Sequence, residues 1–232
     1  MPFSLTRLMA GCAALSAMAG FALAPASAHA FEQGEFLAGL YTAPDQLFTV
    51  KSPLGPESYL VDGFERSAGA VTFLDDSGEL FGVICTPSYD VLAGADNDFE
   101  TDAAILRNWF HAATFPRFFE RQIPGAWIVR EEPVLFEGKP AWIAVIYLPH
   151  GSSKIKNDPE TGQPTREDSW RGLVVFSRGE HTYLIMTETA PEPVGHPYLA
   201  KLSGFYRGIT FKAIDPAAPE KSQPETQNAG TF

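Results

Sequence analysis

Alternating carboxylates between residues 96 and 102 are the most suggestive chemistry in the chain. Four acids stand at every second position: Asp96, Asp98, Glu100 and Asp102. Hard oxygen ligands at such a spacing could gather around Ca²⁺, but the EF-hand pattern fails, because Thr101 takes the glycine position and Arg107 that of the bidentate glutamate. We therefore interpret these acids as a solvated loop at the positive N-terminal end of a helix, with a calcium site as the alternative.

The local motifs of enzymes do not occur in the sequence. His111, His150, His181 and His196 form neither H-x-x-x-H nor H-E-x-x-H, the patterns of zinc hydrolases. The nucleophile motif G-x-S-x-G and the two glycine-rich phosphate and dinucleotide motifs are also absent. We expect no catalysis and no cofactor, and we keep a hydrolase whose site is assembled from distant residues as an alternative.

The first thirty residues have the pattern of a secretory signal peptide. Arg7 precedes an apolar stretch, and Ala28-His29-Ala30 forms an A-x-A cleavage site, which predicts Sec-type export to the periplasm or beyond. Residues 8–12 also resemble a lipobox ending at Cys12, but too few residues precede them for a complete signal. Cleavage leaves Cys85 as the only cysteine, and its apolar surroundings predict a packed core residue rather than a reactive thiol.

Composition excludes several classes of protein. The chain has 232 residues, of which 45% are hydrophobic, with 17 Lys and Arg against 28 Asp and Glu and a net charge of −11. So much apolar content is not typical of a disordered chain. The acidic balance argues against nucleic acid as a partner, because phosphate binding depends on cations. After residue 30 no apolar run approaches the roughly 18 residues of a membrane span, so we expect none.

Three tight turns organise the middle of the chain. Gly179-Glu180 fits a two-residue hairpin loop, and residues 137–140 and 75–79 form two further turns between apolar runs. Three hairpins give six antiparallel strands, and Leu47–Lys51 is a candidate for the seventh. Residues 213–232 are rich in proline and polar residues and are predicted to be a disordered tail, which leaves residues 31–212 as a single domain.

Two amphipathic helices are predicted to cover the sheet. Thr101-Asp102 caps the first, and Pro116 ends or bends it. Pro197 begins the second, whose apolar stripe reaches Ile209. Both stripes need an apolar partner, which the hairpins supply. The predicted fold class is therefore α+β, an antiparallel sheet of about six or seven strands flanked by helices.

Two further segments have alternative interpretations. Aromatic residues around Pro116 exceed what one helical stripe can bury. We favour their burial against the sheet over a partner-contact patch formed by Trp109, Phe115, Phe118 and Phe119. The polar segment Gly151–Ser169 is unusually long for a connection between strands. We interpret it as a mobile surface loop, open to a partner, rather than as a catalytic lid.

The order of these elements resembles the PsbP-like fold, which also includes a small Ran-binding protein and periplasmic proteins of the DcrB type. The likeness covers residues 47–211, and its best local pieces are the G-x-P-A turn and the closing aromatic helix. The residues that carry it are Phe48–Val50, Val71–Phe73, Gly138–Ala141, Gly172–Phe176, Tyr183–Thr187 and Phe205–Phe211. The resemblance implies an α/β/α sandwich that acts in binding or assembly, generally without catalysis. Residues 151–169 depart from it.

Together these observations predict an exported, non-catalytic binding or assembly module of the cell envelope that acts through contact with a protein partner. One alternative is a carrier of a small apolar ligand or lipid, which requires a closed apolar cavity between sheet and helix. The other is the hydrolase with a site assembled from distant residues, which requires converging polar side chains in a cleft.

Overall fold

A seven-stranded antiparallel sheet forms the centre of the protein. The computed structural model describes residues 34–55, 59–62, 67–88, 97–152, 154–191 and 195–213, with the backbone alone at 59–62. The sheet has the spatial order β4 (Tyr59–Asp62), β5 (Gly69–Leu74), β6 (Leu80–Pro87), β12 (His181–Glu188), β11 (Ser169–Arg178), β8 (Lys139–Leu148) and β7 (Trp127–Phe136). Every neighbouring pair is antiparallel, so the predicted α+β class is confirmed.

The three predicted hairpins are present, and one of the turns is shorter than predicted. The loop between β11 and β12 consists of Gly179 and Glu180, with Gly179 at φ 59°. The loop between β7 and β8 is also two residues long, because Glu137 (φ 49°) and Gly138 (φ 77°) alone make the turn. Lys139 and Pro140 were expected in that turn but belong to β8.

A second, four-stranded sheet contains the segment that the sequence suggested as the seventh strand. Its spatial order is β1 (Glu35–Leu37), β2 (Leu40–Thr42), β3 (Phe48–Lys51) and β13 (Ile209–Phe211), and a short helix η1 (Pro44–Gln46) joins β2 to β3. The segment does form a strand, β3, but the prediction that it belongs to the main sheet was wrong. Ile209, expected on the second helix, begins β13 instead and pairs with Val50.

The first helix runs further than a helix with an internal proline usually does. α1 (Phe99–Trp109) is capped by Asp98, whose side chain accepts the backbone N–H of Thr101, so the predicted cap lay too late. Two wide π-helical segments follow, η2 (Phe110–Thr114) and η3 (Pro116–Glu120). A π turn bonds residue i to i−5, which spares Pro116 a clash with the carbonyl four residues back.

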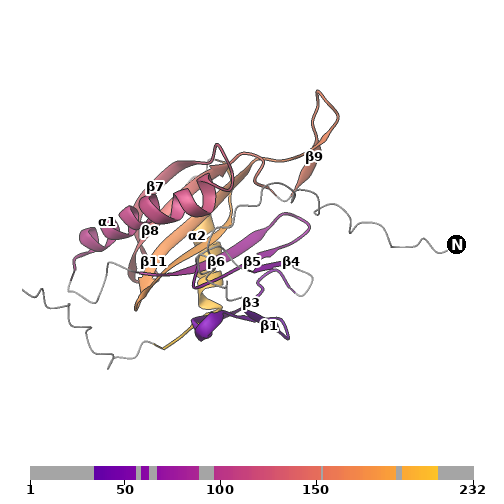
Figure 1. Cartoon of the computed structure of the whole chain (residues 1–232). Coiled ribbons are helices and arrows are strands. Elements are labelled where there is room, and N and C mark those ends of the chain that lie inside the picture. The colour runs from indigo at the N-terminus through magenta and orange to yellow at the C-terminus, as the bar shows by residue number, and fades with distance from the viewer. Residues whose placement is uncertain are drawn as a thin grey trace, which may run out of the picture. The chain divides into compact units, whose positions relative to one another are not determined.

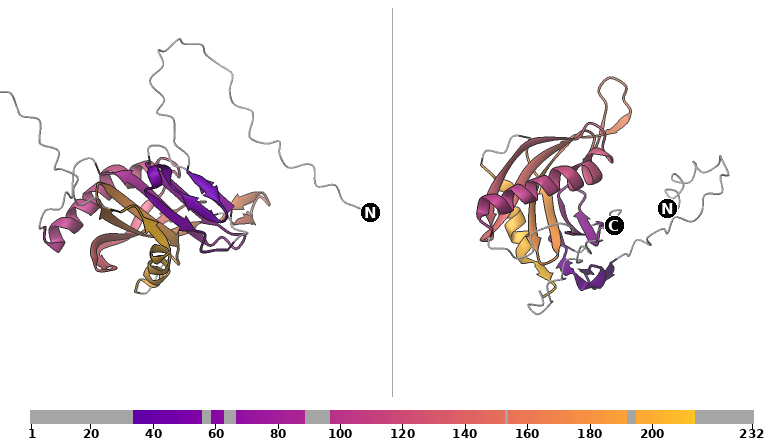
Figure 2. Two further views of the ribbon diagram at one scale, coloured as in Figure 1. Left: turned by 90° about the horizontal axis from the view of Figure 1, so that it is seen from below. Right: turned by 60° about the vertical axis from the view of Figure 1, so that its left-hand side comes forward.

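Helices cover both faces of the large sheet, as an α/β/α sandwich requires (Figure 1, Figure 2). α1 and its π-helical extension pack on one face through Leu106, Phe110 and Phe119. The second helix, α2 (Pro197–Arg207), packs with the small sheet on the other face through Leu202 and Phe205. Burial on both faces explains why the central strands read as continuous apolar runs. Among the described residues, no helix combines the length and the apolarity needed to cross a bilayer.

The predicted domain limits lie largely outside the described residues. The signal peptide (1–30) and the tail (213–232, apart from Ala213) stay predictions, as does the single domain of residues 31–212.

Two glycines distinguish tight packing from open helix surface. A methyl group on Gly172 of β11 would lie 2.5 Å from the ring of Tyr198, whereas one on Gly204 of α2 would have no neighbour within 4 Å. We expect Gly172→Ala to lower the free energy of unfolding by about 1–3 kcal/mol through overpacking. Gly204→Ala should raise it by about 0.5–1 kcal/mol through helix propensity. Urea denaturation measures both, and two shifts of the same sign would contradict this packing.

Candidate functional site at the arm end of the large sheet

The acidic residues proposed for calcium do not form a ligand cluster in the described part of the chain. Asp98 caps α1, and the backbone N–H of Thr101 at 2.8 Å holds the pKa of its carboxyl below the usual value. Asp102 accepts the amide of Asn97 at 3.1 Å, and Glu100 lies in the first turn of α1. Asp96 lies outside the described residues. No group of three or more His, Cys, Asp or Glu side chains suited to a metal occurs among the described residues.

The aromatic residues around Pro116 mostly belong to the core. Phe118 and Phe119 are each 4% exposed and pack with the apolar cluster beneath α1. Trp109 and Phe115 are partly buried against the same cluster. The wide π turns direct both halves of the segment toward the sheet, which leaves Phe118 and Phe119 little surface for a partner.

Cys85 lies in the middle of β6 with no exposed surface. Burial raises the pKa of its thiol to about 12. Because the thiolate is the reactive form, this cysteine stays protonated and acts as a small core residue.

Histidine and glutamate pairs join both helical layers to the edge strand β7. On the α1 face, Glu131 lies 2.7 Å from His111 Nε2 and also accepts Trp142 Nε1–H at 3.0 Å. On the α2 face, Glu132 lies 2.8 Å from both His196 and Arg130. The consecutive glutamates point to opposite faces, as neighbours in a strand must. Their contacts fasten helices to a strand and give no support to the hydrolase alternative.

A hollow of about 590 Å³ lies on the surface beside η1. It is lined by Gly34, Glu35, Thr42, Ala43, Pro44, Asp45, Gln46 and Lys212. These residues are largely polar, and the hollow lies beside the small sheet rather than between the large sheet and a helix. It is therefore not the cavity that a lipid carrier requires.

The long polar segment forms an ordered projection that we name the arm, Ile155–Arg166. Its strands β9 (Ile155–Asn157) and β10 (Pro164–Arg166) pair antiparallel and project from the end of the large sheet (Figure 1). At the tip, Asp158 Oδ1 accepts the backbone N–H groups of Glu160 and Thr161 at 3.0 and 2.7 Å. The segment was expected to be a mobile loop between strands, and the structure shows instead that it contains a short strand pair of its own, with side-chain caps at the tip. Its mobility stays a prediction.

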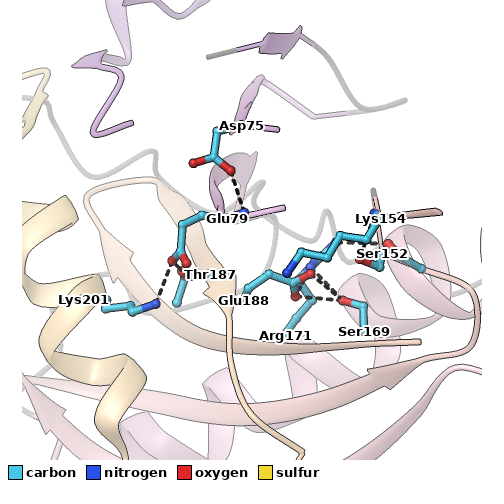
Figure 3. Close-up of polar contacts among 10 residues, drawn as sticks. Asp75, Glu79, Ser152, Lys154, Ser169, Arg171, Thr187, Glu188 and Lys201 are labelled. Carbon is cyan, nitrogen blue, oxygen red and sulfur yellow. Dashed lines mark hydrogen bonds and ion pairs between the residues drawn. The ribbon is translucent and has the colours of Figure 1, made fainter. Parts of the chain in front are cut away.

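A buried ion pair anchors the base of the arm (Figure 3). Arg171, 7% exposed, pairs with Glu188 across β11 and β12. Ser169 Oγ donates to Glu188 Oε2 at 2.7 Å and accepts Arg171 Nη1–H at 2.8 Å. Arg171 Nη2 reaches the carbonyl of Gly151 at 3.3 Å, which ties the chain entering the arm to the sheet. Both terminal nitrogens of the buried Arg171 guanidinium therefore have hydrogen-bond acceptors.

Backbone hydrogen bonds extend this anchor into the arm. Ser152 N–H donates to the Glu167 carbonyl at 3.1 Å, and Glu167 N–H donates to the Lys154 carbonyl at 3.0 Å. Ser152 is 4% exposed, and its hydroxyl accepts Lys154 N–H. The base of the arm is therefore continuous with the sheet.

The opposite face of the same sheet end carries a second, more exposed group. Glu79 accepts the ammonium of Lys201 from α2 at 2.8 Å and the hydroxyl of Thr187 at 3.4 Å (Figure 3). Thr187 and Glu188 are neighbours in β12, so alternation directs one group to each face. The Lys201 side chain is 48% exposed, which makes this pair weaker than the buried one.

Three aromatic rings form a row across the sheet beside the arm, which we name the aromatic row. Trp127, Tyr147 and Trp170 stand directly opposite one another on β7, β8 and β11. The ring centroids are 6.0 Å apart for Trp127–Tyr147 and 5.2 Å for Tyr147–Trp170. Trp127 is 53% exposed. The row lies on the α2 face, one row beyond Gly172, where the start of α2 packs.

Asp168, two residues after the arm, contacts the middle residue of the aromatic row. Its carboxylate accepts the backbone N–H of His150 at 3.0 Å and the hydroxyl of Tyr147. These hydrogen bonds, led by that of His150, hold the pKa of Asp168 below its usual value. The hydrogen bond between Asp168 and Tyr147 also raises the pKa of Tyr147, because the phenol donates to a carboxylate.

Neither the ion pair nor the aromatic row was predicted from the sequence as a functional site. The loop Gly179-Glu180 fixes the hairpin register and thereby places Arg171 opposite Glu188, so a signal for the pair was present. The row had no comparable signal. A β-bulge between Ile128 and Arg130 shifts the register of β7, so the pairing of Trp127 with Tyr147 cannot be counted from the turn. Tyr147 pairs with Trp170 on β11, and the long segment that contains the arm separates these two strands in the sequence.

Comparisons with known proteins give a weak match at the level of the fold. No protein-family model and no curated protein matches the chain. The cyanobacterial PsbP of Synechocystis is 14% identical, covers 76% of this chain and 95% of its own, and has a TM-score of 0.38. A protein of Bacteroides thetaiotaomicron is 8% identical, covers 75% of this chain and 48% of its own, and has a TM-score of 0.37. The PsbP-like resemblance thus concerns the fold alone.

Removing the buried cation should destabilise the protein more than removing the exposed one. We expect Arg171→Met to lower the free energy of unfolding by about 2–3 kcal/mol, because Glu188 loses its cation in a largely buried site. The matched control Lys201→Met should cost less than about 1 kcal/mol. Limited proteolysis should also cut the arm faster in Arg171→Met. Equal losses of stability in the two variants would contradict the anchoring role.

The lowered pKa of Asp168 predicts how its contribution varies with pH. A depressed carboxyl pKa adds stability above the unfolded pKa, near 4, and this contribution is lost as the pH falls through the folded value. We compare the unfolding free energies of the wild type and Asp168→Asn by denaturation across this range. The wild-type advantage should be largest near neutrality and shrink in acid, whereas a constant difference would exclude a role for the charge.

Proposed function

We propose that this protein is an exported, non-catalytic binding module of the cell envelope that contacts a protein partner through its arm. The observation that carries the proposal is a ribbon that projects from the sheet on a buried ionic anchor. Residues 1–30 supply the predicted export signal. The anchored ribbon supports a role in binding or assembly, and none of the side-chain groups described above favours the carrier or the hydrolase.

Among the described residues, the arm adds nothing to the apolar core clusters, which supports a role in binding a partner rather than in stabilising the fold. A two-stranded ribbon is marginally stable by itself, so its order depends on Arg171 and on the hydrogen bonds at its base. Ile155 on β9 is 68% exposed, although its side chain is large and apolar. An ordered segment that buries nothing of its own fits a surface that a partner covers.

The charged residues divide the arm into a basic part near Ile155 and an acidic part at the tip. Lys154 and Lys156 flank Ile155, and Arg166 lies directly opposite it on β10. Asp158 and Glu160 stand at the tip. Interfaces commonly combine an apolar centre with a polar rim. We therefore expect a protein partner that covers Ile155 and presents an acidic group to Arg166, which shares its face of the ribbon because the two residues are paired.

Site-specific photocrosslinking tests the proposal in intact cells. A photoreactive amino acid replaces Ile155 in one variant and Leu135 of β7 in the control, because both side chains are 68% exposed. We expect position 155 to give a discrete crosslinked protein in the envelope fraction, and position 135 to give none. The same crosslink pattern from both positions, or none from position 155, would refute contact through the arm.

A further inference from the structure

We propose that the aromatic row of Trp127, Tyr147 and Trp170 binds the sugar rings of an extended glycan. This site is separate from the partner contact of the arm and does not depend on it. The three rings lie side by side on three adjacent strands of the same sheet face. One face of a pyranose ring carries mostly C–H groups, which pack on the π face of an aromatic side chain. An aromatic row therefore offers successive positions for successive sugars.

The spacing of the row fits a chain of rings. Its centroids are separated by 6.0 and 5.2 Å, close to the roughly 4.8 Å between neighbouring strands. An extended glycan advances by a similar distance for each sugar. The ring planes are tilted by 57° and 54° to their neighbours. A tilted row suits a single twisted chain in solution better than the flat surface of an insoluble polymer.

Polar groups lie on both sides of the row, toward the arm and toward the middle of the sheet, and suit a ligand rich in hydroxyl groups. Asp168 hydrogen-bonds Tyr147, and its side chain is 40% exposed. On the same face of β7, Arg130, 48% exposed, lies one row further along the sheet, and Glu132, 37% exposed, lies two rows further. Planar carboxylate and guanidinium groups can exchange their bound water for sugar hydroxyls. Polar groups placed beside apolar ring faces are what a sugar needs.

The same charges disfavour an apolar protein surface as the occupant. A protein interface excludes water from its centre, so the Arg130–Glu132 pair and Asp168 would lose solvent without gaining new hydrogen bonds. A glycan leaves these groups hydrated or bonded to hydroxyls. Trp127, at the outer edge of the row, is 53% exposed, so much of its ring is open to a ligand. The row therefore combines one exposed ring, Trp127, and two partly buried rings, Tyr147 and Trp170, with polar neighbours that are exposed to solvent.

Calorimetric titration with soluble oligosaccharides tests the proposal. Cellohexaose, chitohexaose and maltohexaose serve as probes for the mature protein, with tryptophan fluorescence as a second readout. We expect at least one of them to bind, and Trp127→Ala to weaken that binding by about tenfold or more. The control Leu135→Ala alters another exposed side chain on the same strand and should bind as the wild type does.

The possible outcomes decide the proposal. No binding of any of the three hexasaccharides by the wild type would overturn it, and so would equal binding by the wild type and Trp127→Ala. Binding that Trp127→Ala and Leu135→Ala weaken equally would also overturn it, because the effect would then not belong to the row. A confirmed glycan site leaves the crosslink from position 155 unchanged, so the two proposals can fail independently.

Discussion

Alternation of side chains along β11 is the constraint on which the rest of this structure depends. Successive residues of a strand point to opposite faces, and here both faces must be buried. Leu173 and Val175 pack beneath α1, whereas Val174 and Phe176 pack beneath α2 and the small sheet. A strand that serves two cores has no polar position in its middle. Polar function can therefore appear only where the strand leaves both cores, at its ends.

The same alternation builds the functional end of the sheet. Ser169 and Arg171 continue the α1 side of β11 and meet Glu188, while Trp170 continues the α2 side and meets Tyr147. One face thus carries a buried ionic anchor, and the other carries an aromatic row that stays partly open. A buried ion pair is rarely a net source of stability, because desolvation opposes it. Here its geometric consequence matters more, since Arg171 also binds Gly151 in the chain that leads into the arm.

Local patterns in the sequence predicted most elements of the fold and little of the site. Gly179-Glu180 specified a hairpin with its register, and Pro197 marked the first residue of α2. Leu47–Lys51 looked like another strand of the main sheet, because nothing local distinguishes one antiparallel sheet from another. Pro116 suggested a helix end, since a switch to π-helical bonding has no local signature. The aromatic row depends on the bulge in β7 and on pairing across the arm, and both are tertiary effects.

The central claim is that the arm is a fixed projection fastened to the sheet at its base. Native-state hydrogen exchange tests it most directly, through the amides of Ser152 and Glu167, which bond to carbonyls within that base. If the account is correct, both amides exchange as slowly as those in the middle of β11, because they open only with the sheet. If they exchange as fast as unprotected loop amides while β11 stays protected, the arm is not anchored and the account is contradicted.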